Sequence, residues 1–171
     1  MARTIKLNLG YETVVSSKDY GKVLRAGPWH VKFGKHKGGS MLHPYAVHSV
    51  FLGNHKWRTV RLHRFLLGVT SPKVKVDHKN GNGLDNQRRN LRKATNGQNK
   101  SNSKKALNTS SQFKGVRKVR NRWSAQITFN KHHTWLGSFA KEQDAADAYD
   151  KAAIKVHGEF ALTNAMLRGK A

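Results

Sequence analysis

The sequence predicts an α+β protein made of two domains. In its second half, apolar and polar residues alternate strictly from Trp123 to Phe129, which is typical of a strand with one buried face. A helix is expected from 142 to 157, ended by Gly158. Its apolar stripe consists of Ala145, Tyr149, Ala152 and Val156. The first half alternates only in short runs between Gly and Asn turns, which indicates a β-rich module.

The first half is expected to contain several short elements. Short strands are predicted within 4–15 and at 29–33, 45–47, 50–52 and 57–62, and Ser16 or Ser17 is a candidate cap for a short helix. A basic, glycine-rich loop follows at 34–40. His63 and Arg64 begin another short helix, whose apolar residues 65–67 point into the core.

Residues 76–100 are the most informative stretch of the chain. Asp77 and His78 end a short apolar run, and the turn residues 81–83, Gly-Asn-Gly, tolerate positive φ. Leu91 then leads to Thr95, a candidate N-cap, and Asn99 follows one helical turn later. The predicted order is strand, loop, short strand and short helix, so Asp77, His78 and Asn99 can converge.

Composition suggests where the two domains end. Residues 100–112 are rich in Ser, Asn and Lys and nearly free of apolar residues, so they cannot form a core. We therefore predict a first domain at 1–103, with its functional part at about 63–103, and a basic polar linker at 104–112. The second domain, 113–165, is expected to be a three-stranded antiparallel sheet packed on one helix.

The charge of the chain favours a polyanionic partner. The formal net charge is +24 over 171 residues, with a pI of about 10.9. A membrane surface is the alternative partner, but the sequence has neither a long apolar run nor a basic amphipathic helix with large apolar residues. Between Tyr20 and Lys141 the only carboxylates are Asp77 and Asp85, so a function for Asp77 is expected from composition alone.

Several classes of protein are disfavoured by what the sequence lacks. It contains no cysteine, so disulfides and thiolate zinc sites are excluded. The first residues do not contain the apolar segment of a signal peptide, and the longest apolar stretch is too short to cross a bilayer. We expect a soluble intracellular protein.

The stretch 76–100 resembles the HNH nucleases with a ββα metal finger, in the Asn-for-His form found in phage homing endonucleases. The matching residues are Asp77-His78, the turn at Gly81-Asn82, Asn90-Leu91-Arg92, and Asn99. The resemblance implies that Asp77 and Asn99 bind a divalent metal and that His78 is the general base. It also implies that Asn90 holds the finger and His78 in place. The family often has a His-Arg pair just upstream of the finger, so two interpretations of 63–64 stay open: a phosphate contact by Arg64 or a position of His63 near the cut, and a structural helix start.

The chemistry of these residues suits the implied roles. Mg²⁺ prefers oxygen ligands and often takes only one or two from the protein, and Mn²⁺ can substitute for it. A carboxylate and an amide oxygen meet that requirement, and an imidazole titrates near neutral pH. The alternative interpretation of 76–100 is a solvated Asn/Gly-rich loop. No small-molecule cofactor is expected.

The second domain resembles the APETALA/ethylene-response-factor-type DNA-binding domain, which also occurs in phage HNH nucleases. The match runs through Lys114-Gly-Val-Arg117, 123–127, 135–139, 145–153 and Gly158. It implies a sheet in the DNA major groove, with contacts from Lys114, Arg117, Gln126, Thr128 and Trp135. Between Val119 and Arg122 this chain is shorter than the plant domains, which have a Trp-Gly there.

The alternation of this sheet points to the same face of the domain. Arg117, Arg122, Ser124, Gln126 and Thr128 are expected opposite the helix, where they could contact base edges. In the linker, Lys104 and Lys105 are candidates for phosphate contacts, with a solvated charge run as the alternative.

Two functions compete at this point. The first is a metal-dependent DNA endonuclease that its second domain directs to double-stranded DNA. It would be a mobile enzyme of phage type, either intron-borne or free-standing, that acts in the bacterial host cytoplasm. The second is a sequence-specific DNA-binding regulator with an inactive nuclease half. Asp77, His78 and Asn99 are all present, which favours the enzyme. The oligomeric state, including a monomer, stays open.

Overall fold

A computed structural model of the protein describes residues 1–34, 43–105 and 109–169. The predicted loop at 34–40 lies outside these residues after Gly34, as do residues 106–108 of the predicted linker. The chain forms two compact units, Met1–Thr95 and Asn96–Ala171. Helices and antiparallel sheets occur in both units, so the predicted α+β class is confirmed.

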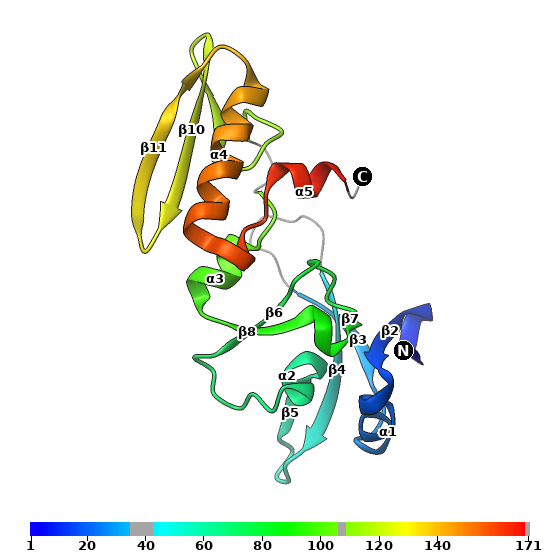
Figure 1. Ribbon diagram of the computed structural model, residues 1–171. Coiled ribbons are helices and arrows are strands. Elements are labelled where there is room, and N and C mark those ends of the chain that lie inside the picture. The colour runs from blue at the N-terminus through cyan, green and yellow to red at the C-terminus, as the bar shows by residue number, and fades with distance from the viewer. Residues whose placement is uncertain (35–42, 106–108, 170–171) are drawn as a thin grey trace. The chain divides into compact units, whose positions relative to one another are not determined.

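The first unit contains three small sheets (Figure 1). One joins β1 (Ala2–Lys6), β2 (Glu12–Ser16) and β7 (Asp85–Asn86), and another joins β3 (His30–Phe33), β4 (Pro44–Phe51) and β5 (Trp57–Arg61). The third pairs β6 (Lys75–His78) with β8 (Leu91–Ala94). The strands predicted at 45–47 and 50–52 are one continuous strand, because every residue from Val47 to Phe51 pairs with β5.

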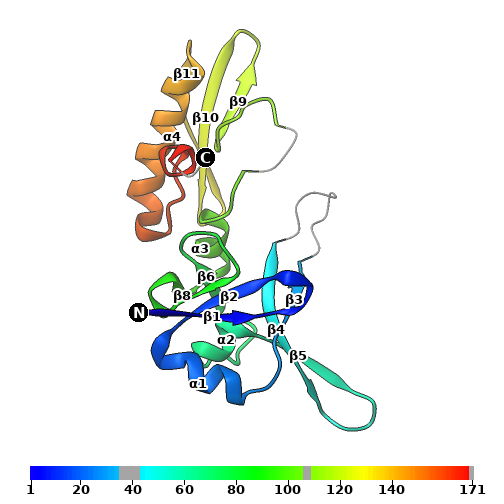
Figure 2. The same cartoon turned by 90° about the vertical axis from the view of Figure 1, so that its right-hand side faces the viewer.

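Short helices connect these strands. They are α1 (Ser17–Arg25) and α2 (Leu62–Leu66), with 3₁₀ turns η1 (Asn8–Gly10) and η2 (Arg88–Asn90). Helix α1 packs beside the β1–β2 hairpin (Figure 2). The core between them is apolar, with Val15, Val23 and Leu62 fully buried. Arg88 donates two hydrogen bonds of 2.8 Å to the buried carboxylate of Asp19, which ties η2 to α1.

The second unit has the architecture predicted for its sequence. After α3 (Asn96–Ser101) come β9 (Val116–Val119), β10 (Arg122–Phe129) and β11 (His132–Phe139), in the sheet order β11-β10-β9. Helix α4 (Glu142–His157) lies across this sheet (Figure 1), and η3 (Gly158–Phe160) and α5 (Asn164–Arg168) end the unit. The small residues Ala145, Ala146 and Ala153 let α4 lie close to Ala125 and Ile127.

Backbone details of this sheet explain two of its features. Asn130 and Lys131 both have positive φ and Phe129 pairs with His132, so the β10–β11 connection is a tight two-residue turn. Gly115 has φ +76°, and a Cβ there would lie 1.9 Å from the ring of Tyr149. Position 115 therefore excludes every larger residue.

Among the described residues, no helix is both long and apolar enough to cross a bilayer.

Candidate functional site

The β6–β8 hairpin positions the first predicted site residue, Asp77. Asp77 pairs with Arg92 across the two strands, and the Arg92 Nε and one Nη each lie 2.8 Å from the same Asp77 carboxylate oxygen. Both side chains are almost completely buried, so this ion pair has little solvent around it. The carboxylate that was expected to bind metal is thus held in one orientation by a neighbouring cation.

His78 is the next residue of β6 and is also buried. Its Nε2 lies 3.3 Å from Oδ1 of Asn86, on β7. Its ring stands perpendicular to the ring of His63, from α2, with 4.9 Å between centroids. Tyr45, at the start of β4, contacts both imidazoles, with centroid distances of 5.6 Å and 6.2 Å. Elements from three parts of the first unit therefore fix the imidazole that was expected to be the base.

The loop between β6 and β8 is cross-linked by Asn90. Its amide nitrogen donates to the Asp85 carbonyl at 2.7 Å and to Oδ1 of Asn80 at 3.0 Å, and its oxygen accepts from the Asn80 backbone N–H. Asp85 accepts hydrogen bonds from Asn80 and Gln87, so the second carboxylate of this basic region stabilises the loop. In this structure the side chain of Asn90 contacts the loop.

A glycine in this loop allows the finger to approach β4. A Cβ at Gly83 would lie 2.4 Å from the Pro44 carbonyl oxygen and 2.9 Å from the ring of Tyr45. Only glycine fits at position 83, because any side chain there would collide with β4. This close approach lets Tyr45 lie next to the two histidines.

Burial lowers the pKa of both histidines. For His63, burial is the largest cause and the positive charges of His78, Arg61 and Arg64 add to it, which brings its pKa from 6.5 to about 3. The pKa of His78 is also lowered, chiefly by burial, against the opposing effects of Asn86, Asp77 and Asp85. Both rings are neutral at pH 7, and a neutral imidazole is the form that can accept a proton.

Acid is expected to destabilise the protein through His63. Between about pH 6.5 and pH 3 the unfolded chain binds a proton on this residue that the folded chain does not, so the free energy of unfolding falls as pH falls, by at most about 1.4 kcal/mol per pH unit. Urea unfolding of wild type and His63→Gln at about pH 7 and pH 5.5 would measure this. The variant should show the smaller pH dependence; an equal dependence would contradict the assignment.

Asn99, the second predicted metal ligand, lies on α3 and is exposed. Helix α3 belongs to the second compact unit, whereas Asp77 and His78 belong to the first. Among the described residues, no group of three or more His, Cys, Asp or Glu side chains could hold a metal ion. A carboxylate and an amide oxygen still fit a hard divalent cation that takes its other ligands from phosphate and water.

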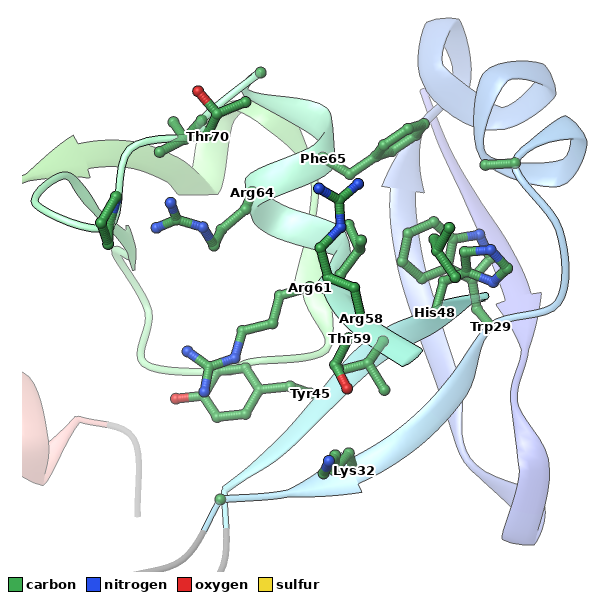
Figure 3. A pocket seen from close by; sticks show the side chains of 18 of the residues that line it. Trp29, Lys32, Tyr45, His48, Arg58, Thr59, Arg61, Arg64, Phe65 and Thr70 are labelled. Atoms are coloured by element: carbon green, nitrogen blue, oxygen red, sulfur yellow. The ribbon is translucent and has the colours of Figure 1, made fainter. Parts of the chain in front are cut away.

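A basic groove of about 1150 Å³ lies in the first unit, beside Tyr45 (Figure 3). The cations that line it are Lys32, Arg58, Arg61, Arg64 and Lys75, and no carboxylate is among its described lining residues. Figure 3 shows the Arg61 guanidinium next to the Tyr45 ring, with Trp29 and His48 together at the other side. Tyr45, which lines this groove, also lies beside the buried ring of His78, with 6.2 Å between the centroids.

Arg64 has a structural role within this groove. Its guanidinium donates to the carbonyl oxygens of Val74 and Ser71, each at 2.7 Å, and so holds the segment that leads into β6. This contact favours the structural alternative for the pair His63-Arg64. Arg58 and Arg61, in contrast, are exposed on β5.

The open face of the second unit's sheet carries most of the predicted DNA contacts. Arg117, Gln126, Thr128 and Trp135 are all exposed, and Trp135 is 68% exposed. A register shift after Ala125 places Trp135 opposite Gln126, while Leu136 packs towards α4. This bulge brings the indole onto the same face as the polar residues.

Two residues of that face interact with Ser138 of β11. Ser124 was expected to be open but is buried. It pairs with Ser138, whose hydroxyl and carbonyl accept hydrogen bonds from Arg122 at 3.1 Å and 2.8 Å. The guanidinium of Arg122, a predicted DNA contact, therefore lies over the neighbouring strand β11.

The predicted lysine contacts differ in their surroundings. Lys114 is partly buried, its ammonium donates to the Ser101 carbonyl, and burial lowers its pKa to about 8 against the effect of Asp150. Lys105 donates to the hydroxyl of Thr109 at 2.6 Å, whereas Lys104 is exposed. The predicted linker is also more ordered at its end than expected, since the buried Ser111 donates to Glu142 at 2.6 Å.

Several residues around the site were not identified from the sequence. They are Thr13, Tyr45, Asn86 and the Arg92 side chain as the partner of Asp77. Only Asn86 and Arg92 lie within the recognised stretch, and the spacing of the motif could have drawn attention to them. Thr13 is separated from Asn86 by 73 residues, so no local pattern connects the two.

Comparisons with known proteins match both halves of the predicted architecture. The chain is 36% identical over 111 residues to an uncharacterized HNH endonuclease of Acanthamoeba polyphaga mimivirus, covering 61% of this chain and 57% of that protein. That match covers more residues than either compact unit contains, so it draws on both units. No protein-family model matches the chain.

Plant proteins match a shorter part of the chain. A putative AP2/ERF and B3 domain-containing protein of Oryza sativa is 47% identical over 60 residues, or 34% of this chain and 19% of that protein. The AP2/ERF and B3 domain-containing transcription repressor TEM1 of Arabidopsis thaliana is 45% identical over 56 residues, covering 32% and 16%. The resemblance to an HNH endonuclease combined with an AP2/ERF-type domain is therefore confirmed, and the chain spans less than two thirds of each of these relatives.

Proposed function

We propose that this protein is a metal-dependent DNA endonuclease that hydrolyses a phosphodiester bond and is directed to its target by the second unit. The observation that carries the proposal is the neutral, buried His78 at the end of β6, next to Asp77 and held by Asn86. A nuclease base needs a fixed, unprotonated imidazole beside a carboxylate that can bind a cation, and these two residues supply both. The nuclease relative supports the same activity.

In the proposed reaction His78 takes a proton from the water that attacks the phosphorus atom. Asp77 and Asn99 are the residues that would hold a divalent cation, Mg²⁺ or Mn²⁺, and such a cation would stabilise negative charge on the phosphate and on the leaving oxygen. Asn90 keeps the loop between β6 and β8 in shape, which preserves the position of both site residues. Arg92 balances the buried charge of Asp77 and limits the directions it can adopt.

Double-stranded DNA is the proposed substrate. The groove with Arg58 and Arg61 is also lined by Tyr45, the neighbour of His78, and its cations would bind one backbone of the duplex. On the second unit, Arg117, Gln126, Thr128 and Trp135 present hydrogen-bonding and stacking groups on one open face, which we assign to the major groove. The biological role that we propose is that of a mobile, phage-type homing endonuclease.

The competing function is a DNA-binding regulator without nuclease activity, favoured by the plant relatives, one of which is a transcription repressor. One experiment separates the two. The purified protein is incubated with genomic DNA and Mg²⁺ or with EDTA, and the new DNA ends are mapped. The nuclease should produce ends at defined positions in Mg²⁺ only. If the protein binds DNA but produces no new ends in either condition, the DNA-binding regulator is the better interpretation.

The open face of the sheet is expected to determine which sequence is cut. Arg117→Ala should weaken binding to the preferred target by about 1 to 3 kcal/mol and relax one base position, if this arginine contacts guanine. Lys151→Ala is the matched control, because it removes one exposed positive charge on α4. Cut-site profiles on a randomised duplex library at one salt concentration would compare them. Identical profiles for both variants would exclude Arg117 from recognition.

A further inference from the structure

We infer that Asn86, supported by Thr13, is a positioning residue that determines which nitrogen of His78 carries the proton. The inference deepens the proposed function, because it concerns the residue assigned as the base. It rests on the contacts between three fully or largely buried side chains and the carbonyl groups beside them.

The contacts of Thr13 fix the orientation of the Asn86 amide. The Thr13 hydroxyl lies 2.7 Å from the Leu84 carbonyl oxygen, which can only accept, so its single proton is used there. Towards Asn86 the same hydroxyl oxygen must accept, and the Asn86 atom 2.8 Å away must be the amide nitrogen. The Gly83 carbonyl, 3.3 Å from that nitrogen, imposes the same orientation.

The amide oxygen of Asn86 then faces Nε2 of His78, 3.3 Å away. An amide oxygen cannot donate, so the proton of the neutral ring is on Nε2 and its lone pair is on Nδ1. The order of donation runs from His78 to Asn86, from Asn86 to Thr13, and from Thr13 to the Leu84 carbonyl. Nδ1 is consequently the atom that accepts a proton from water.

These hydrogen bonds are stable because the residues that form them are buried. Thr13 and Asn86 are 0% exposed, so water does not compete for their polar atoms. Thr13 is on β2 and Asn86 on β7, and these strands pair in parallel through Val14 with Asp85 and Val15 with Asn86. The β1–β2 hairpin thus contributes directly to the site, because Thr13 on β2 helps to orient His78 through Asn86.

The first test reads the proton position without any reaction. Full-length ¹⁵N-labelled protein is studied in EDTA at about pH 8, where imidazoles are neutral, by long-range ¹H–¹⁵N correlation of the His78 ring. The expected spectrum is that of the Nε2–H tautomer. A spectrum dominated by Nδ1–H, or an even mixture of the two, would overturn the inference. If the protein did not cleave DNA, the proposed function would be wrong, but this measurement of the His78 tautomer would still test the inference.

The second test uses two variants of Thr13. Thr13→Val keeps the shape but loses the hydroxyl, and Thr13→Ser keeps the hydroxyl. Thr13→Val should lower kcat about 10- to 100-fold, the range for partners that orient a functional histidine, with KM unchanged and with a mixed tautomer spectrum. Thr13→Ser should restore both. Wild-type kcat and spectrum in Thr13→Val, or equal losses in both variants, would refute the inference; thermal unfolding of each variant checks that it is folded.

Discussion

His78→Ala is expected to lose DNA cleavage by a factor of about 10² to 10⁴ while binding to the same duplex stays near that of wild type. The imidazole acts on the attacking water, and it is buried among His63, Tyr45 and Asn86, so it contributes little to the charge that attracts DNA. Single-turnover cleavage with Mg²⁺ measures the first quantity, and duplex binding in EDTA measures the second.

The control for this variant is His55→Asn. His55 is exposed in the β4–β5 turn with φ +57°, a conformation that Asn tolerates, so the change removes a histidine outside the site. It should leave the cleavage rate unchanged. Near-normal cleavage by His78→Ala at neutral pH would remove His78 from the reaction and with it the proposed role of the finger.

Asp77→Asn is expected to reduce cleavage at least about 10²-fold, because the several kcal/mol of charge stabilisation that a bound cation supplies depends on the carboxylate that holds it. The asparagine keeps the size of the side chain. Both Asp77→Asn and Asp77→Ala remove the counter-charge of the buried Arg92 guanidinium, but the asparagine keeps an oxygen that can accept its hydrogen bond. Asp77→Ala removes that acceptor as well and is the weaker test, because breaking a buried ion pair in this way can destabilise the fold by about 3 to 5 kcal/mol.

Removing the cation should give the same result as removing its ligand. EDTA should abolish cleavage by wild type, and Asn99→Ala should reduce it as Asp77→Asn does, while duplex binding in EDTA persists. Asp144→Asn, which changes an exposed carboxylate in the first turn of α4, is the matched control and should cleave normally. Cutting at the wild-type rate in EDTA would exclude a metal-dependent mechanism altogether.

The short-range features of the fold were predictable because they depend on neighbouring residues. The strict alternation from Trp123 to Phe129 and the small-residue stripe of α4 predicted a strand and a helix, and both are present. The spacing of Asp77, His78, Leu91 and Thr95 predicted the order strand, loop, strand and helix, which the structure has as β6, β8 and α3. Composition alone favoured a specific role for Asp77.

Contacts between distant residues were decided only by the tertiary structure. The sequence did not show that Thr13 and Asn86 would be buried together, that Tyr45 would lie against two histidines, or that the Arg92 guanidinium would neutralise Asp77. Nor did alternation reveal that Ser124 is buried or that a bulge turns Trp135 outward, because both depend on register with β11. The sequence by itself determined which groups are available for chemistry. The tertiary structure decided the protonation state and the orientation of these side chains, because both depend on burial and on hydrogen-bond partners that are distant in sequence.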